Sequence, residues 1–157
     1  CRNNISINTI ITQCSHYVTT SAQKKELTHT LASLLNEFKT KDLFATISSS
    51  PSASFEHPFI LKHPPFIIQG RMDIVLQQGD TIQIIDIKSD RTLPESIPKH
   101  HPYHYQLLLY SLAAAHIWPN KTISASLHFI RHHQTVPLTF SAKEKELFST
   151  QLSELVK

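Results

Sequence analysis

The chain has 157 residues, of which 40% are hydrophobic and 17% charged, and its formal net charge is +3 at pH 7. This length suits one domain over residues 1–157 that buries about two-thirds of its unfolded surface, and the composition excludes a disordered chain. The small positive charge is compatible with nucleic-acid binding but does not by itself demonstrate it.

The two cysteines, Cys1 and Cys14, are too few for a four-cysteine zinc or iron–sulfur site. They favour a reducing compartment, which we take to be the cytoplasm, although a single disulfide stays open. The sequence has no apolar run near the roughly 20 residues of a membrane span and no signal-peptide pattern. Because the chain begins with cysteine and not with methionine, we expect it to be a fragment of a longer protein.

The first third of the chain gives one clear element. Residues 1–20 fit a short strand or a helix equally well. Ser21–Thr40 has apolar residues at helical spacing, which predicts an amphipathic helix. Thr46–Ser54 is rich in serine and is predicted to be a surface connection.

Ser54–Leu61 is predicted to be the first strand of a sheet. Phe55, Phe59 and Leu61 would share one face, and Glu56 would lie on the other. From that face the Glu56 carboxylate could reach a metal ion, although an ordinary exposed glutamate on a strand explains the residue equally well.

The centre of the sequence is a predicted hairpin. Two apolar-rich runs, Phe66–Gln77 and Thr81–Lys88, flank a glycine–aspartate pair at 79–80. Glycine as the first residue of a two-residue loop is typical of a type II′ turn. The resulting register places Asp73 directly opposite Asp86, with Cβ atoms about 4.5–5.5 Å apart.

Asp73 and Asp86 would repel each other at this distance unless a cation lay between them, and Lys88 shares their face. Hard oxygen ligands suit Mg²⁺ or Mn²⁺, which polarise phosphoryl oxygens and lower the pKa of bound water. Lys88 could orient or deprotonate the attacking water, or offset transition-state charge. Solvated charges on an exposed turn are the simpler alternative. The many neighbouring isoleucines argue against it, because unpaired charge is costly on buried faces.

Arg91–Tyr103 contains three prolines, lacks periodicity and is predicted to be a loop that overhangs the carboxylates. Basic residues there could contact phosphates, although a flexible loop with incidental basic residues is the blander explanation. The candidate DNA-binding residues are Arg71, Lys99, His101 and Tyr103.

His104–Trp118 is predicted to be a helix, with prolines near its start and just beyond its end. Gln106 and Tyr110 are four residues apart and share a face, and Tyr103 lies close to it. If this face points at the carboxylates, these side chains could bind a phosphate of the scissile strand or fix Lys88.

The C-terminal part completes an α/β pattern. Thr122–Arg131 alternates as a strand, and Thr135–Phe140 is its expected hairpin partner. Ser141–Glu144 matches a capping box and begins a final helix. The residues expected to form its buried stripe are Leu147, Leu152, Leu155 and Val156. The order of elements predicts a central mixed β-sheet flanked by helices.

Asp73, followed after a hairpin by Asp86-Ile87-Lys88, resembles the motif of the PD-(D/E)xK nucleases. The ordered set of motifs is more similar still to the RecB/AddA-type nuclease domain of helicase–nucleases. The matching segments are Glu56-His57-Pro58-Phe59, Gly70-Arg71-Met72-Asp73, Asp86-Ile87-Lys88, and Gln106 with Tyr110, within roughly residues 55–131.

This resemblance implies a restriction-endonuclease-like α/β sandwich and a Mg²⁺-dependent deoxyribonuclease of the exonuclease type, with Mn²⁺ as a substitute and no iron–sulfur cluster. It implies DNA as substrate and, as partners, the helicase domains of the parent chain and a partner subunit, in double-strand-break repair and recombination. The implied metal ligands are Asp73, Asp86 and the backbone carbonyl of Ile87, with Glu56 as a further candidate. The implied catalytic residues are Asp73, Asp86, Lys88, Gln106 and Tyr110.

The upstream metal-ligand histidine of this family has one candidate here, His16. Its surroundings lack the expected glycine and its spacing to Glu56 is short, so a surface or capping role explains it better. The family's histidine would then precede Cys1 in the parent protein. Two other interpretations stay open: an inactive nuclease-like domain that binds DNA or acts as a scaffold, and a different phosphodiesterase such as a resolvase or restriction-type enzyme.

Overall fold

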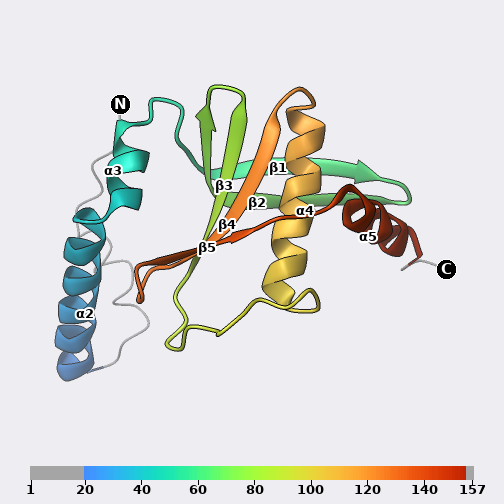
Figure 1. The fold of residues 1–157 in the computed structure, drawn as a ribbon. Coiled ribbons are helices and arrows are strands. Elements are labelled where there is room, and N and C mark those ends of the chain that lie inside the picture. Colours follow the sequence, from blue (N-terminus) through green and yellow to red (C-terminus); the bar gives the residue numbers. More distant parts are fainter. Residues whose placement is uncertain (1–19, 155–157) are drawn as a thin grey trace. The chain divides into compact units, whose positions relative to one another are not determined.

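The computed structural model describes residues 20–154, so His16 lies outside the described residues. The chain divides into two compact units, separated after Thr46. The first contains helix α2 (Ser21–Lys39) and most of helix α3 (Asp42–Ser49), and the second contains the sheet and the remaining helices (Figure 1).

Helix α2 confirms the amphipathic helix predicted for Ser21–Thr40. Thr20 caps it: the Thr20 hydroxyl accepts from Gln23 N at 3.2 Å, and Thr20 N donates to Gln23 Oε1 at 3.1 Å. This reciprocal pair satisfies two of the amide groups that a helix start leaves without partners.

Helix α3 was not predicted, and the surface connection expected at Thr46–Ser54 is wrong over its first four residues, which belong to this helix. Apolar residues at 43, 44 and 47 fall on one side of two helical turns. The Phe44 ring packs edge-to-face on Phe38, with centroids 5.8 Å apart. This side-chain packing, more than the serine-rich composition, decides the local structure.

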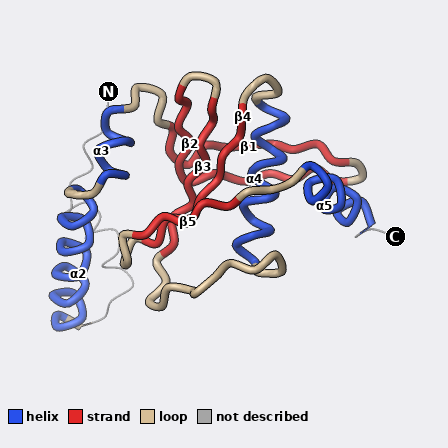
Figure 2. Tube along the Cα trace, viewed as in Figure 1, coloured by secondary structure: helices blue, strands red, loops and turns tan. Residues whose placement is uncertain are grey.

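The second unit is built around one five-stranded sheet. Its five strands are β1 (Ser54–His63), β2 (Phe66–Gln78), β3 (Thr81–Lys88), β4 (Thr122–Phe129) and β5 (Gln134–Leu138), in that spatial order. Strands β3 and β4 are parallel and the other neighbours are antiparallel. Helix α4 (Pro102–Ile117) provides the crossover that a parallel pair requires, and α5 (Ala142–Glu154) follows β5 (Figure 2). The predicted α/β class, a central mixed sheet flanked by helices, is confirmed.

The predicted hairpin between β2 and β3 is confirmed together with its register. Gln78 pairs with Thr81, so the loop has two residues, and the ladder continues to Ile74 opposite Ile85. Gly79 has φ of 58°, a conformation that glycine adopts without strain and that the first position of a type II′ turn needs.

Strand β1 agrees with its predicted position but not with its predicted faces. Phe59 and Leu61 are buried, whereas Phe55 is 60% exposed. The reason is Glu56, whose φ of 49° interrupts the β1–β2 ladder between the pairs made by Phe55 and His57. A side-chain alternation read from sequence does not continue through such an interruption.

Helix α4 packs against strands β1, β3 and β4 and is apolar around most of its circumference. It begins at Pro102, one residue after the capping residue His101, so the predicted loop ends two residues earlier than expected. Strands β4 and β5 are each shorter than predicted. In Figure 1 the long yellow-green loop leads from the end of β3 to the start of α4.

The predicted buried stripe of the last helix is wrong for Leu147, which is 57% exposed. Leu152 is half-buried, and Leu155 and Val156 lie outside the described residues. Helix α5 has little of the sheet to cover, because α4 already occupies the central strands. Within residues 20–154, none of the helices combines the length and the hydrophobicity that crossing a membrane requires.

Candidate active site

The candidate site lies where β2 and β3 separate. Asp73 and Asp86 are the first residues beyond the last pair of their ladder, Ile74 with Ile85. Here the Asp73 Oδ2 accepts a hydrogen bond from Ile87 N at 2.8 Å. A side-chain carboxylate therefore satisfies an amide of β3 at the point where the two strands separate, and this bond fixes Asp73 beside Asp86.

Asp86 is a carboxylate in an unusually dry position, only 2% exposed. Burial raises the pKa of Asp86; the Lys88 ammonium acts in the opposite direction, and the Asp73 charge raises the pKa further. Lys88 Nζ lies 2.6 Å from Asp86 Oδ2, although this oxygen has no partner in good hydrogen-bond geometry among the described residues. The contact is thus an ion pair that leaves Asp86 incompletely satisfied.

Lys88 is held from three sides, and its side chain is only 14% exposed. Besides Asp86, its Nζ donates to Gln106 Oε1 at 2.7 Å and lies 4.2 Å from the centre of the Tyr103 ring. Gln106 Nε2 in turn donates to the Tyr110 hydroxyl at 3.1 Å. The structure therefore brings Lys88 of β3 together with Gln106 and Tyr110 of α4, which the sequence analysis had grouped.

Tyr103 also belongs to this group, as its predicted position close to the face of Gln106 and Tyr110 allowed. We predicted it both as a DNA contact and as one of the side chains that could fix Lys88; its ring covers the Lys88 ammonium, and its hydroxyl donates to Asp90 Oδ1 at 2.8 Å. The hydrogen bond to Asp90, together with burial, raises the pKa of Tyr103. Asp90 was missed altogether, because it follows the end of β3, where no periodicity relates it to Lys88.

Phe59 packs against the ring of Tyr110. The two rings pack edge-to-face with centroids 5.7 Å apart. Gly70 lies beneath Phe59, since a Cβ at this position would stand 2.9 Å from two atoms of the Phe59 ring. The glycine of the Gly-x-x-Asp segment therefore has a physical role: it leaves room for the ring that packs on Tyr110.

The other predicted site residues make no direct contact with Lys88 that the structure records. Glu56 is exposed, and its charge is among those that raise the pKa of Tyr110, behind the dominant effect of burial. Arg71 is exposed on β2. His101 caps α4, because its Nδ1 accepts from Tyr103 N at 3.2 Å. Lys99 contacts Glu144 on α5 at 3.5 Å.

The point where β2 and β3 separate, which we call the fork, has oxygen donors that suit a divalent cation. Within residues 20–154 there is no cluster of three or more His, Cys, Asp or Glu side chains arranged to hold a metal. Mg²⁺, however, commonly binds through one or two carboxylates and keeps several waters. The incompletely satisfied Asp86 oxygen next to the Asp73 carboxylate is the kind of donor that such a cation would complete.

Comparison with known proteins gives one informative match. The family model described as the PD-(D/E)XK nuclease superfamily matches residues 8–157. The match is to the superfamily as a whole and does not distinguish the RecB/AddA type. The mixed sheet with its flanking helices is consistent with the restriction-endonuclease-like fold of that superfamily.

The other comparisons add no functional information. No curated protein matches the sequence. A solved structure described as "Crystal structure of SSO0001" is 13% identical, with a TM-score of 0.47, over 94% of this chain and 71% of that chain. Similarity at this level carries no argument about function.

Proposed function

Since this chain belongs to the PD-(D/E)XK nuclease superfamily, whose members are generally metal-dependent nucleases, we propose that it is a Mg²⁺-dependent deoxyribonuclease domain that hydrolyses phosphodiester bonds. Mn²⁺ would substitute for Mg²⁺. The observation that most supports this proposal is the position of Lys88. Its ammonium is held at 2.6 Å from Asp86 and 2.7 Å from Gln106, beside the fork where Asp73 is fixed.

In this proposal Asp73, Asp86 and the backbone carbonyl of Ile87 hold the metal, and Glu56 is a further candidate ligand. When bound, the metal supplies Lewis-acid polarisation of the phosphate and a more acidic water. The two carboxylates also repel the negatively charged scissile phosphate, so a cation is needed to offset this repulsion when the phosphate approaches.

Lys88 is the proposed contact to the reacting atoms. Its Nζ would orient the attacking water or donate a hydrogen bond to the phosphate oxygen on which negative charge develops. Gln106 Oε1 accepts a hydrogen bond from Lys88 Nζ, and the Tyr110 hydroxyl accepts one from Gln106 Nε2, which keeps the amide from rotating. Together these bonds hold the ammonium in one orientation before substrate arrives, and such preorganisation is what electrostatic catalysis needs.

We further propose that the domain is the nuclease module of a RecB/AddA-like helicase–nuclease with exonuclease action in double-strand-break repair and recombination. The ordered set Gly70–Asp73, Asp86–Lys88 and Gln106 with Tyr110 supports this narrower assignment. The proposed partners are DNA, the helicase domains of the same parent chain and a partner subunit. Arg71, Lys99, His101 and Tyr103 remain the candidate contacts to DNA.

The test is cleavage of end-labelled linear DNA and of closed circular DNA by the full-length protein in Mg²⁺ or Mn²⁺. Lys88→Gln removes the ammonium but leaves an amide that can donate to Asp86, so it should abolish cleavage. Because the loss of one partner of a buried ion pair is destabilising, circular dichroism must show that the variant is folded under the assay conditions. Lys121→Gln is the matched control, because Lys121 pairs with Asp80 at 2.9 Å at the far end of the hairpin. It should cleave like the unmodified protein.

Exonuclease action predicts that only the linear DNA is degraded. If the full-length protein cuts neither substrate in either metal, the assignment is wrong, and an inactive DNA-binding or scaffolding module is the better description. Degradation of both linear and circular DNA would support nuclease activity but contradict the exonuclease assignment.

A further inference from the structure

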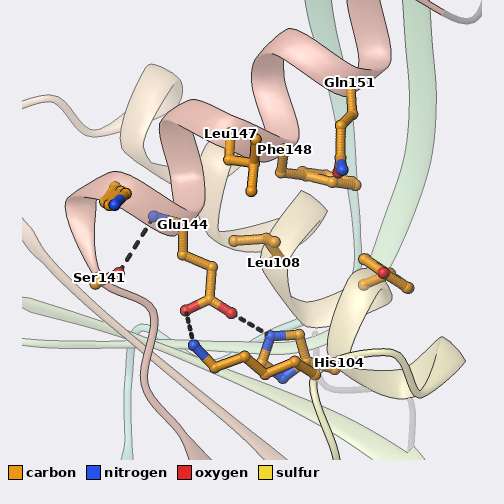
Figure 3. Close-up of a pocket in the computed structure, with 10 residues that line it drawn as sticks. His104, Leu108, Ser141, Glu144, Leu147, Phe148 and Gln151 are labelled. Carbon is orange, nitrogen blue, oxygen red and sulfur yellow. Dashed lines mark hydrogen bonds and ion pairs between the residues drawn. The ribbon is translucent and has the colours of Figure 1, made fainter.

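A groove of about 290 Å³ lies between α4 and α5, and the active-site contacts described above do not use it. In Figure 3, Leu108, Leu147 and Phe148 form its apolar wall, while Glu144 and His104 meet at one end. On α4, Gln106 contacts Lys88 and Tyr110 contacts Gln106, whereas Tyr105 and Leu108 line the groove from another side of the same helix.

The groove exposes aromatic surface. The Tyr105 side chain stacks on Phe148, with centroids 5.9 Å apart and an interplanar angle of 22°, yet Tyr105 remains 43% exposed. Leu147 on the same wall is also largely exposed. A planar apolar group placed on Tyr105 would extend the existing stack and remove this surface from water.

The charges around the groove favour an anion. The groove holds one carboxylate, Glu144, whose Oε1 accepts from His104 Nε2 at 2.7 Å and whose Oε2 lies 3.5 Å from Lys99 Nζ. Lys99 is nevertheless 80% exposed, and Lys143 is exposed as well. An aromatic surface with an exposed ammonium at its edge matches a base attached to a phosphate.

We propose that this groove binds single-stranded DNA, with one base stacked on Tyr105 and a neighbouring phosphate at Lys99. The inference rests on the proposed function, since the strand would be part of the nuclease substrate. The start of α4 links the two sites: Tyr103 covers Lys88, and Tyr105, about 3 Å further along the helix axis and about 200° around it, lines the groove. A strand that passes the start of α4 can therefore contact both.

A protein partner fits the groove less well. The groove has a volume of about 290 Å³, which lies near the lower end of the usual range for small-molecule sites. That volume suits a flat group of the size of a nucleoside. The wall is also aromatic and aliphatic, and such surfaces stack bases without requiring a particular sequence.

The test measures binding and not cleavage, so it is independent of the nuclease assignment. The full-length protein is titrated without metal into fluorescent oligodeoxythymidine, and into an abasic oligonucleotide with the same number of phosphates. Tyr105→Ala should weaken binding of oligodeoxythymidine by about 5- to 150-fold and leave binding of the abasic oligonucleotide unchanged. Lys99→Ala should weaken binding of both and reduce the dependence on salt concentration.

Tyr105→Leu serves as a second variant, since it keeps an apolar contact to Phe148 and loses only the planar face. Phe55→Ala is the control, because Phe55 is an exposed aromatic residue on β1 that does not line the groove. Equal oligodeoxythymidine binding by Tyr105→Ala, Tyr105→Leu and Phe55→Ala would overturn the proposal and would leave the groove to a protein contact. If binding depends on Tyr105 but the protein cleaves no DNA, the proposed DNA binding in the groove is supported and only the proposed nuclease activity is refuted.

Discussion

Replacing Gly70 with alanine should disturb the candidate active site without touching any of its polar residues. The added Cβ would stand 2.9 Å from both Cε1 and Cζ of Phe59, closer than side-chain atoms normally approach. Phe59 is only 4% exposed and packs on Tyr110, so its ring can move away from the added Cβ only by changing this contact or by entering the open pocket that it lines with Gly70. The strain must therefore shift either strand β2 or the ring, and a shifted ring displaces Tyr110.

The expected loss of stability is about 1–3 kcal/mol, the usual cost of inserting a methyl group into a filled core. The cleavage rate should fall as well. If the Tyr110–Gln106 bond at 3.1 Å is lost, Lys88 loses part of its support, and one hydrogen bond is worth about 0.5–1.5 kcal/mol. That energy corresponds to about a 2- to 12-fold slower reaction if the bond is fully formed in the transition state.

Urea unfolding and single-turnover cleavage measure the two effects, and a double-mutant cycle tests their cause. Phe59→Leu shortens the side chain that Gly70→Ala would meet, so the double variant should be less destabilised than the sum of the single variants. Gly79→Asn is the control: a Cβ there meets no atom within 4 Å, and asparagine tolerates the φ of 58°. Strictly additive losses in Gly70→Ala/Phe59→Leu would refute the proposed packing contact.

Tyr103→Leu should lower kcat about 2- to 30-fold, because the ring lies 4.2 Å from Lys88 Nζ, and Tyr103→Phe should retain most activity; equal losses in the two variants would contradict a role for the ring. Mn²⁺ at a hundredfold excess over Kd should stabilise the unmodified protein by about 2.7 kcal/mol in thermal unfolding but should not stabilise Asp86→Asn, and a similar shift in both proteins would place the metal elsewhere. Burial acts to raise the pKa of Glu144, but the hydrogen bond from His104 and nearby positive charge outweigh it and lower the pKa below 4.5. The folded state then binds the proton more weakly than the unfolded state. The ionised Glu144 therefore stabilises the fold fully above about pH 5, and this contribution is lost as the pH falls through the folded-state pKa. Between about pH 6 and pH 3, urea unfolding should show a steeper fall in the free energy of unfolding for the unmodified protein than for Glu144→Gln.

The polar core of the candidate site was predictable because it is local. A two-residue turn with glycine in its first position sets the hairpin register, and the register alone brings Asp73 next to Asp86. Helical spacing likewise places Gln106 and Tyr110 on one face. Both arguments depend only on repeat distances of the backbone, which the amino-acid sequence carries directly.

Elements without a repeat were less predictable. Helix α3 was missed because its serines suggested a loop, whereas three apolar side chains hold it as a helix. Phe55 was assigned to the wrong face because nothing in the sequence marks the left-handed backbone at Glu56. Leu147 was expected to be buried, although the neighbouring helix had already covered the sheet.

What the sequence by itself determined is therefore the α/β class, the central hairpin and the candidate carboxylate–lysine set. Only the tertiary structure decided what surrounds that set: Tyr103 over Lys88, Asp90 on the Tyr103 hydroxyl, and Phe59 between Gly70 and Tyr110. It also decided that α4 and α5 enclose a groove. These contacts join segments whose separation follows no period, so their geometry depends on how the whole core packs and not on the local chain.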